Sequence, residues 1–404
     1  MANTFPLQLL SVSRKAPEVI VPARPTPGEM KNLSDIDDQE SFRFQVPLLF
    51  FYENNPSPLM KGKDPVKVIK EALSKALVFY YPLAGRLREG PNRKLTVDCS
   101  GEGALFIEAE ANFKLKQLGS AIQPPFPYLD ELLYNVPGSD GILGCPLLLI
   151  QVTCIHQEYE LEINDNPDAF RTANPNDINL KSFYLGPKDI KALRQQLPLH
   201  LRNCSTFDLL VAFTWRCQTI GLNLDPEETV QFSCLVNVRG KSSNMTLPSG
   251  YYGNAVVFSA ILSKAEVLCG SPLEYAVELV KKAKDKVNEE YIRSAMDLME
   301  IKGRRVKYPT RVNFIVSDVS KLGFEQVDLG WGKPIFGGIA SPVSPQTTLF
   351  LKYIKYEGES GILIPIRLPQ SNMERFEEEL KRMIQGCRIK DLCNDKETQI
   401  ICRL

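Results

Sequence analysis

The chain has 404 residues, 44% of them hydrophobic, which is enough for two domains of ordinary size that each bury a core. Lys plus Arg (48) equals Asp plus Glu (48), so no summed charge would draw the protein to nucleic acid or to an anionic membrane. We therefore expect a globular protein whose partners are small molecules, with no nucleic-acid partner and no membrane partner.

Three features of the sequence predict the cytosol as its compartment. The apolar runs within residues 1–17 are too short for a signal-peptide core, and no apolar run approaches the length of a membrane span. The ten cysteines include no C-x-x-C pair, which is typical of reduced, mostly buried thiols rather than of disulfides or a zinc site, so we expect no metal. The terminal Cys402-Arg403-Leu404 is similar to the peroxisomal address S-K-L, so the peroxisome is the alternative.

The first third of the chain mixes predicted helix and strand. A helix is predicted to begin at its N-cap Asp64 and to end at Pro82, with its apolar residues on one face. Residues 94–99 alternate like a strand, and after a Gly-Glu-Gly turn residues 105–109 are predicted to be its hairpin partner. Residues 146–155 are mostly apolar and partly β-branched, which predicts a buried strand.

Polar composition with repeated Asn-Pro pairs makes residues 158–180 the best linker candidate. The predicted division is an N-terminal half, residues 1–157, and a C-terminal half, residues 181–404. Without regular β-α-β alternation, the mixture favours an α/β fold with mixed, α+β-like sheets over a doubly wound nucleotide-binding fold. The elements predicted in the second half are helices after the cap Ser205, over 272–293 and over 374–384, and strands over 230–238, 312–316 and 349–353.

Residues 328–332 read D-L-G-W-G, close to the D-F-G-W-G signature of the plant CoA-dependent acyltransferases of the BAHD family. Further sequence segments resemble the family along nearly the whole chain. They occur in the same order as in the family, which makes the resemblance specific. It is nearest to members that esterify alcohols such as benzyl alcohol or methanol with aromatic acyl-CoA. The matching segments are residues 33–40, 81–87, 90–94, 123–127, 204–207 and 250–255.

This resemblance implies two similar halves with the fold of chloramphenicol acetyltransferase, the first of them truncated here, and a channel at their interface. Acyl-CoA and the alcohol would enter the channel from opposite sides, acyl-CoA being a co-substrate of a monomeric enzyme that holds no bound cofactor. A histidine of an H-x-x-x-D motif would remove the hydroxyl proton, and the oxygen would then attack the thioester carbonyl. Such general-base catalysis needs an imidazole whose pKa lies near the working pH.

The chain contains no H-x-x-x-D. It has two histidines: His156 is followed four residues later by Glu160, and His200 by Cys204. We considered His156 with Glu160 as a replacement for the catalytic pair. A solvated loop histidine is the better interpretation of His156, and a structural role is the better interpretation of His200.

In the family, the H-x-x-x-D motif lies between two segments that this chain also resembles. Here those two segments meet directly at Thr153 and Cys154, which we interpret as an internal deletion. It could be a true variant, a splice product or an error in predicting the gene. The first functional hypothesis is an acyl-CoA-dependent alcohol O-acyltransferase, impaired as written because the catalytic histidine is missing. The second is a non-catalytic truncated homologue that binds CoA weakly, pairs with an intact relative or folds poorly.

The remaining site residues come from the resemblance alone. Asp328 carries a catalytic label through the family motif, yet its Gly-rich surroundings favour a structural role. Trp331 and Gly332 complete the motif, and Arg239 is the expected ion-pair partner of Asp328.

Lys241 and Ser242 follow that arginine, where family members place basic and polar groups near the CoA phosphates. A lysine can neutralise phosphate charge as a point donor, and a solvated loop lysine is the equally favoured alternative.

Overall fold

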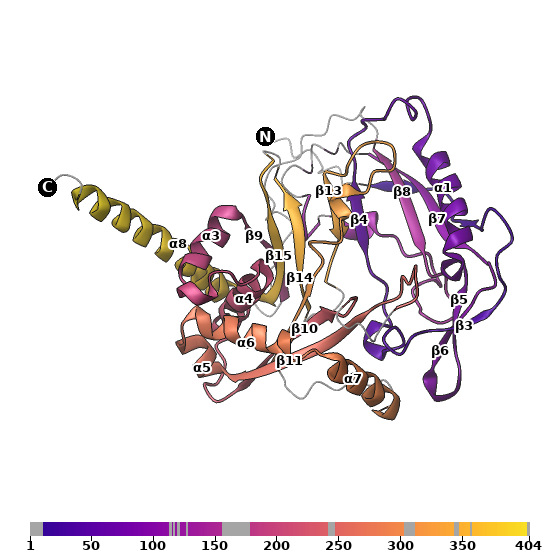
Figure 1. Cartoon of the computed structure of the whole chain (residues 1–404). Helices are drawn as coiled ribbons and strands as arrows, with labels where there is room; N and C mark the ends of the chain where they lie inside the picture. Colours follow the sequence, from indigo (N-terminus) through magenta and orange to yellow (C-terminus); the bar gives the residue numbers. More distant parts are fainter. Residues whose placement is uncertain are drawn as a thin grey trace, which may run out of the picture. The chain divides into compact units, whose positions relative to one another are not determined.

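The computed structural model describes residues 11–112, 115, 118, 122–126, 128–155, 178–240, 247–302, 312–342, 347–355 and 358–401 (Figure 1). The chain forms two compact units. The first comprises Met1–Arg171, Lys302–Arg305 and Phe324–Ser341, and the second comprises Thr172–Ile301, Val306–Gly323 and Pro342–Leu404. Most of the predicted linker lies outside the described residues, so its position stays a prediction. Residues 324–341, placed by the sequence-based division in the C-terminal half, belong to the first unit.

Among the described residues, three small sheets build the first unit. In one, β7 pairs antiparallel with β1 and β2 and parallel with β8; in another, β6 lies between β3 and β5; in the third, β13 pairs antiparallel with β4. The strands are β1 Val12–Arg14, β2 Glu18–Ile20, β3 Met30–Asn32, β4 Leu48–Phe51, β5 Arg86–Glu89, β6 Leu95–Asp98, β7 Ala104–Ala111, β8 Leu149–Ile155 and β13 Phe336–Ile339, and the helices are α1 Pro65–Phe79 and α2 Leu129–Leu132.

Local signals define α1 as the sequence predicted. The Asp64 carboxylate accepts a hydrogen bond from the backbone N–H of Val66 at 2.9 Å, and proline occupies the first helical turn, where a missing N–H costs nothing. Leu77 is buried in a small core with Ala84 and Ala104, so the apolar face of the helix covers the start of β7. The predicted helix is confirmed.

The predicted hairpin between residues 94–99 and 105–109 is wrong. Both segments are strands, β6 and β7, but they belong to different sheets. The turn between them includes Gly103, whose φ is +96°, and a Cβ added there would lie 2.5 Å from the carbonyl oxygen of Ile20. At this glycine the chain passes close to β2 and enters the sheet of β7, so it does not turn back to pair with β6.

The strand predicted within residues 146–155 is confirmed as β8, but the burial predicted for it is not. Each of its seven residues is only partly buried. β7 is the described strand that pairs with β8, and it does so along all seven positions, Leu105 opposite Leu149 through Ala111 opposite Ile155. Because a buried parallel strand is covered on both faces, β8 has less cover than its sequence predicts.

In the described part of the second unit, the strands form a mixed six-stranded sheet in the order β11-β10-β12-β14-β15-β9 (Figure 1). Its centre, β10-β12-β14, is parallel and its other pairs are antiparallel, so the predicted mixed α/β fold is confirmed over a doubly wound one. The strands are β9 Ile178–Leu185, β10 Thr229–Asn237, β11 Val256–Lys264, β12 Val312–Asp318, β14 Thr347–Ile354 and β15 Ser360–Pro369, and the helices are α3 Pro187–Gln195, α4 Thr206–Leu222, α5 Ala265–Gly270, α6 Leu273–Asp285, α7 Glu289–Lys302 and α8 Gln370–Ile401.

The buried helix α4 is the centre of this unit's core. Ser205 and Asp208 form a capping box at its start, which confirms the cap predicted at Ser205. The buried Asp208 carboxylate also forms an ion pair with Lys284 of α6, with Nζ and Oδ1 2.6 Å apart. Farther along, Cys217 has no exposed surface, and burial raises the pKa of its thiol well above the ordinary value. The core that α4 forms with α6 and α8 covers one face of the sheet.

The single helix predicted over residues 272–293 is two helices, α6 and α7. The break lies at residues 286–288, where the Asn288 side chain accepts a hydrogen bond from the backbone N–H of Tyr291 at 2.8 Å. An asparagine that caps in this way starts a new helix. The apolar periodicity continues through the break, and for that reason the sequence pattern did not show it. Among the described residues, no helix has the length and apolar character to span a bilayer.

Candidate functional site

The D-L-G-W-G segment of the first unit is a turn that Asp328 closes on itself. The Oδ1 atom of this exposed residue accepts hydrogen bonds from the backbone N–H groups of Gly330 at 2.7 Å and Gly332 at 3.1 Å. Both glycines have positive φ, +104° and +87°, which other residues rarely adopt. A carboxylate whose oxygen binds backbone donors of its own turn holds the local backbone in place.

Trp331 is the anchor of this turn, with 7% of its surface exposed. The carbonyl oxygen of Gly330 accepts a hydrogen bond from the backbone N–H of Ser57 at 2.9 Å, and a Cβ on Gly330 would lie 2.7 Å from Cγ of Met60. The motif therefore packs against residues that follow β4, 270 positions earlier in the chain.

Tyr52, next to β4, also holds this turn and was not singled out from the sequence. Its hydroxyl donates to the carbonyl oxygen of Val327 at 3.0 Å. Burial, followed by the nearby Asp328 carboxylate, raises the pKa of Tyr52 to about 12. The phenol is therefore a neutral donor at physiological pH. Tyr52 lies outside the motifs that the sequence analysis used, so no sequence pattern indicated its role.

Aromatic side chains pack around the paired strands β4 and β13. Phe126 packs edge-to-face on Phe336, with ring centroids 5.0 Å apart, and also contacts Phe51 at 5.7 Å. Gly337 faces the ring of Phe50 so closely that a Cβ would lie 2.8 Å from it. This packing brings residues 324–341 into the first unit.

Arg239 belongs to the second unit and has partners there. Its guanidinium donates to the carbonyl oxygen of Gly253 at 2.6 Å and lies over the ring of Tyr251, 5.6 Å from its centroid. The ion pair expected between Arg239 and Asp328 would join the two units and stays a prediction. Lys241 and Ser242 lie outside the described residues, as does the proposed replacement base His156.

His200 is the histidine within the described part of the chain. It lies in the short helical turn Leu199–Leu201, with 70% of its side chain exposed, and its Nε2 is 4.0 Å from Oε1 of Glu278. Substrate sites are mostly concave and enclosed, whereas this imidazole is largely in contact with water. The expected structural role of His200 stays a prediction.

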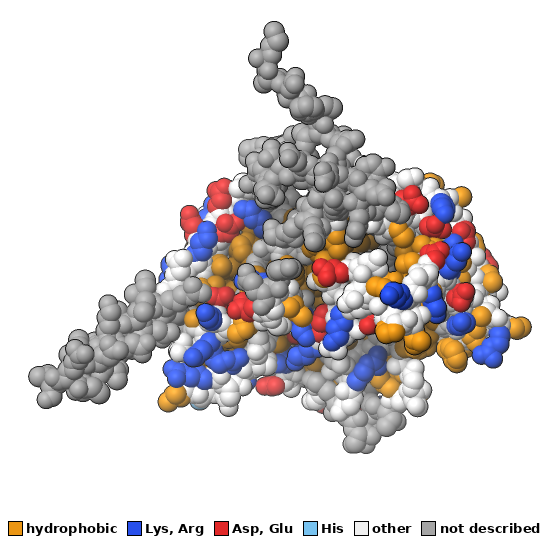
Figure 2. All heavy atoms as spheres, turned by 90° about the horizontal axis from the view of Figure 1, so that it is seen from above, with side chains coloured by type: hydrophobic (Ala, Val, Ile, Leu, Met, Phe, Trp, Pro, Cys, Tyr) orange, Lys and Arg blue, Asp and Glu red, His pale blue; other side chains and the backbone are white. Residues whose placement is uncertain are grey.

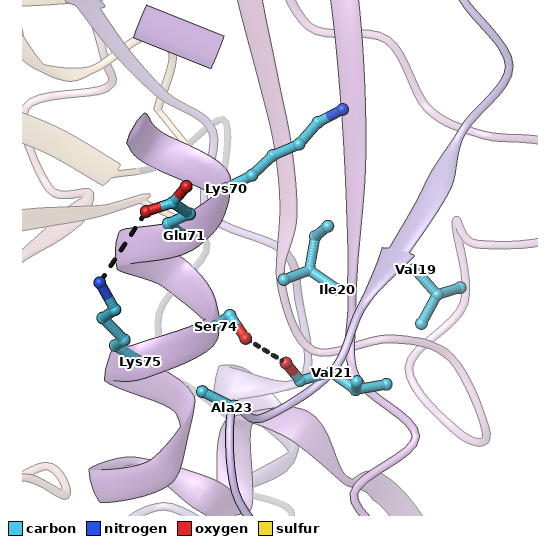
Figure 3. Close-up of a pocket in the computed structure, with 8 residues that line it drawn as sticks. All are labelled: Val19, Ile20, Val21, Ala23, Lys70, Glu71, Ser74 and Lys75. Carbon is cyan, nitrogen blue, oxygen red and sulfur yellow. Dashed lines mark hydrogen bonds and ion pairs between the residues drawn. The ribbon is translucent and has the colours of Figure 1, made fainter. Parts of the chain in front are cut away.

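A pocket of about 470 Å³ in the first unit lies between β2 and α1 (Figure 3). The strand contributes valine and isoleucine side chains and the helix contributes charged residues and Ser74, whose hydroxyl donates to the carbonyl oxygen of Val21 at 2.8 Å. The pocket is open, and none of the predicted site residues lines it. Acidic and basic side chains are interspersed on the face seen in Figure 2, in agreement with the zero net charge.

Comparison with known proteins decides the family. A sequence profile of the Transferase family matches residues 10–157 and 165–383. The chain belongs to this family, the BAHD acyltransferases. It is therefore a member of a family of acyl-CoA-dependent acyltransferases, as its motifs predicted.

Two curated relatives are similar over nearly their full lengths. The chain is 47% identical over 460 residues to alcohol acyl transferase 1 allele GSa of Malus domestica, covering 98% of this chain and 99% of the relative. It is 45% identical over 443 residues to benzyl alcohol O-benzoyltransferase of Petunia hybrida, covering 94% and 95%. The first alignment is longer than the 404-residue chain, so at least 56 of its positions have no residue of this chain.

Solved structures share the fold at low identity. Vinorine synthase superposes with a TM-score of 0.66 at 20% identity, covering 90% of this chain and 96% of that one. TRI101 of F. sporotrichioides, whose crystal structure is a complex with coenzyme A and T-2, superposes with a TM-score of 0.63 at 17% identity, covering 86% of this chain and 97% of that one. These matches confirm the mixed α/β fold.

Proposed function

We propose that this chain is by descent an O-acyltransferase that moves an aromatic acyl group from acyl-CoA to an alcohol such as benzyl alcohol or methanol. The names of the relatives, alcohol acyl transferase and benzyl alcohol O-benzoyltransferase, support this substrate class. Acyl-CoA acts as a co-substrate, not as a resident cofactor. We also propose a monomer located in the cytosol.

One observation limits the activity of the chain as written: its 404 residues contain no H-x-x-x-D. The longer alignment with the apple relative supports a deletion. The family match runs through the Thr153/Cys154 junction and leaves out residues 158–164, so the proposed position of the deletion rests on the family resemblance of the sequence on either side of the junction. Loss of a general base costs about 100- to 10,000-fold in rate, so substrate positioning alone leaves a feeble enzyme.

Asp328 is proposed to be structural and not a catalytic acid or base. Its two hydrogen bonds to Gly330 and Gly332 support this role, because a carboxylate oxygen that accepts two backbone N–H groups is already committed to the turn. Arg239 is proposed to pair with it across the two halves, and Lys241 with Ser242 to lie near the CoA phosphates, in line with their positions in the family text.

The alternative is a non-catalytic homologue, and a third explanation is a wrongly predicted gene whose natural product is an ordinary enzyme. Sequencing the transcript across the codons of Thr153 and Cys154 separates the third explanation from the other two. A transcript that joins these codons directly makes the deletion a property of the protein. A transcript with additional in-frame codons shows that an intact enzyme exists.

Activity is tested on two purified proteins. One is the chain as written, and the other carries the apple relative's segment inserted between Thr153 and Cys154. CoA release is followed with benzoyl-CoA and benzyl alcohol. We expect the insertion variant to be at least 100-fold faster. Equal turnover by the two proteins, abolished by His156→Ala in the shorter one, would assign the general base to His156 and overturn the proposal of impaired catalysis.

A further inference from the structure

Three buried polar side chains form a hydrogen-bonded relay in the six-stranded sheet of the second unit. Nε2 of Gln231 donates to Oγ of Ser233 at 2.8 Å, and the Ser233 hydroxyl donates to Oδ1 of Asn313 at 2.9 Å. The three residues are 3%, 1% and 6% exposed. The relay fixes the orientation of the Asn313 amide, because its oxygen accepts and its nitrogen must therefore turn the other way.

The nitrogen at the end of the relay, Nδ2 of Asn313, is buried and has no hydrogen-bond partner among the described residues. Buried amide donors in native proteins almost always have an acceptor, since leaving one unpaired costs free energy. A buried, oriented and unpaired donor is therefore a place where an acceptor from outside the described chain is expected.

The relay stands on the face of the sheet that is turned away from the helices. Side chains alternate between the two faces along a strand. Phe232, between Gln231 and Ser233, and Phe314, next to Asn313, both belong to the core that α4 and α6 form on one face. The relay residues consequently point to the opposite face.

Buried apolar side chains lie on the same face of the sheet as the relay. Ile315 points to this face because it lies two residues after Asn313 on β12. Leu349 points to the same face because it lies two residues after Thr347, which pairs with Ile315. Both side chains are buried, and neither belongs to the core on the helix side. A few oriented polar groups beside buried aliphatic side chains are the usual composition of a site for a mostly apolar ligand. The uncharged amide suits a carbonyl or hydroxyl oxygen better than a phosphate, which would require a cation nearby.

We propose that Asn313 is a substrate-binding residue whose Nδ2 donates to an uncharged oxygen of a substrate, the carbonyl of the acyl-CoA or the hydroxyl of the alcohol. Ser233 and Gln231 are positioning residues that hold the amide in this orientation. The inference rests on the proposed function and extends it by naming a residue that recognises the substrate.

Binding to the chain as written tests this role without any need for turnover. Calorimetric titrations use CoA, benzoyl-CoA and benzyl alcohol as separate probes. The variants are Asn313→Leu, which removes the donor at similar volume, Asn313→Asp, which replaces the donor by a charged acceptor, and Ser233→Ala, which breaks the relay. Thr348→Val is the matched control, because Thr348 is equally buried in the same sheet but lies opposite Val316 on the helix side.

We expect Asn313→Leu to weaken binding of one probe about 3- to 10-fold, Asn313→Asp to weaken it more, Ser233→Ala to weaken it about 2- to 5-fold, and Thr348→Val to leave it unchanged. Loss with benzoyl-CoA alone assigns the oxygen to the acyl carbonyl, and loss with benzyl alcohol alone assigns it to the hydroxyl. Equal loss with CoA and benzoyl-CoA places the contact on the CoA moiety and overturns the proposal. Ser233→Ala decides the result if the Asn313 variants do not fold.

The proposal is overturned if the parent binds a probe and every variant binds it equally, in which case an ordered water satisfies Asn313. A parent chain that binds none of the three probes removes the proposed function, and this inference with it.

Discussion

The carboxylate of Asp328 stabilises the turn in which it lies, so we expect substitutions of this residue to lower stability. Asp328→Ala removes the acceptor of the Gly330 and Gly332 N–H groups, and we expect it to lower the free energy of unfolding by about 1–2 kcal/mol, because the residue is exposed and water replaces part of the loss. Asp328→Asn keeps an acceptor oxygen, so it should cost less than half as much. Denaturant titration measures both, and equal losses would contradict the proposed turn geometry.

Tyr52 predicts a pH dependence. Its pKa is raised from 10.0 to about 12, so the folded state favours the neutral phenol, and the stability it contributes is complete below pH 10 and lost as the pH rises through about 12. Tyr52→Phe should cost about 0.5–1.5 kcal/mol at pH 7 through the lost hydrogen bond to Val327.

The parent chain should therefore lose stability between pH 10 and pH 12 more steeply than Tyr52→Phe. Tyr184, whose pKa is also raised to about 12, is common to both proteins, so the difference between their profiles isolates Tyr52. Unfolding free energies measured across this range provide the test. Two parallel profiles would show that Tyr52 titrates in the same way in the folded and unfolded states.

At the scale of elements, two neighbouring glycines form a matched pair. Gly101 and Gly103 both have positive φ, but a Cβ at Gly103 would lie 2.5 Å from a backbone oxygen, whereas at Gly101 the nearest atom is 3.7 Å away. We expect Gly101→Ala to cost about 1 kcal/mol from backbone strain alone and Gly103→Ala to cost more than about 3 kcal/mol. Thermal unfolding of the two variants checks the difference. Similar losses would mean that strain, and not the packing against β2, governs the turn.

Local signals explain which elements the sequence predicted well. Asp64 before α1 and Ser205 before α4 are caps that act within one helical turn, and both helices begin where these residues predict. Strand pairing depends instead on residues far apart in sequence. The sequence therefore identified β6 and β7 as strands but assigned them wrongly to one hairpin, since nothing local shows that Gly103 packs on Ile20.

At the scale of the whole molecule, the motif text predicted the family, but it could not locate Tyr52 or the Asn313 relay. Tyr52 reaches Val327 across 275 positions of sequence, and Ser233 reaches Asn313 across 80. Such pairs exist only after the strands have paired. Short motifs carry the identity of a family member, whereas the contacts that give each motif residue its role come from the folded chain.

The partial burial of β8 leads to a prediction about amide hydrogen exchange when the relative's segment is inserted. Each residue of β8 is only partly buried in the chain as written. Insertion of the relative's segment after Thr153 divides β8, and we expect the segment to cover the part of the strand that precedes it, so amide hydrogen exchange over residues 149–153 should slow by at least about tenfold. β10, in the centre of the other sheet, is the internal reference and should not change. Unchanged exchange in β8 would show that the segment docks elsewhere or not at all.

The complete burial of Cys217 has a practical consequence for kinetics. Thiol reagents attack the thiolate, and this thiol is both inaccessible and held in its protonated form. A maleimide can therefore modify Cys217 only during moments when α4 separates from its neighbours. The rate of Cys217 modification, measured by mass spectrometry under native conditions, therefore reports how often the core of the second unit opens.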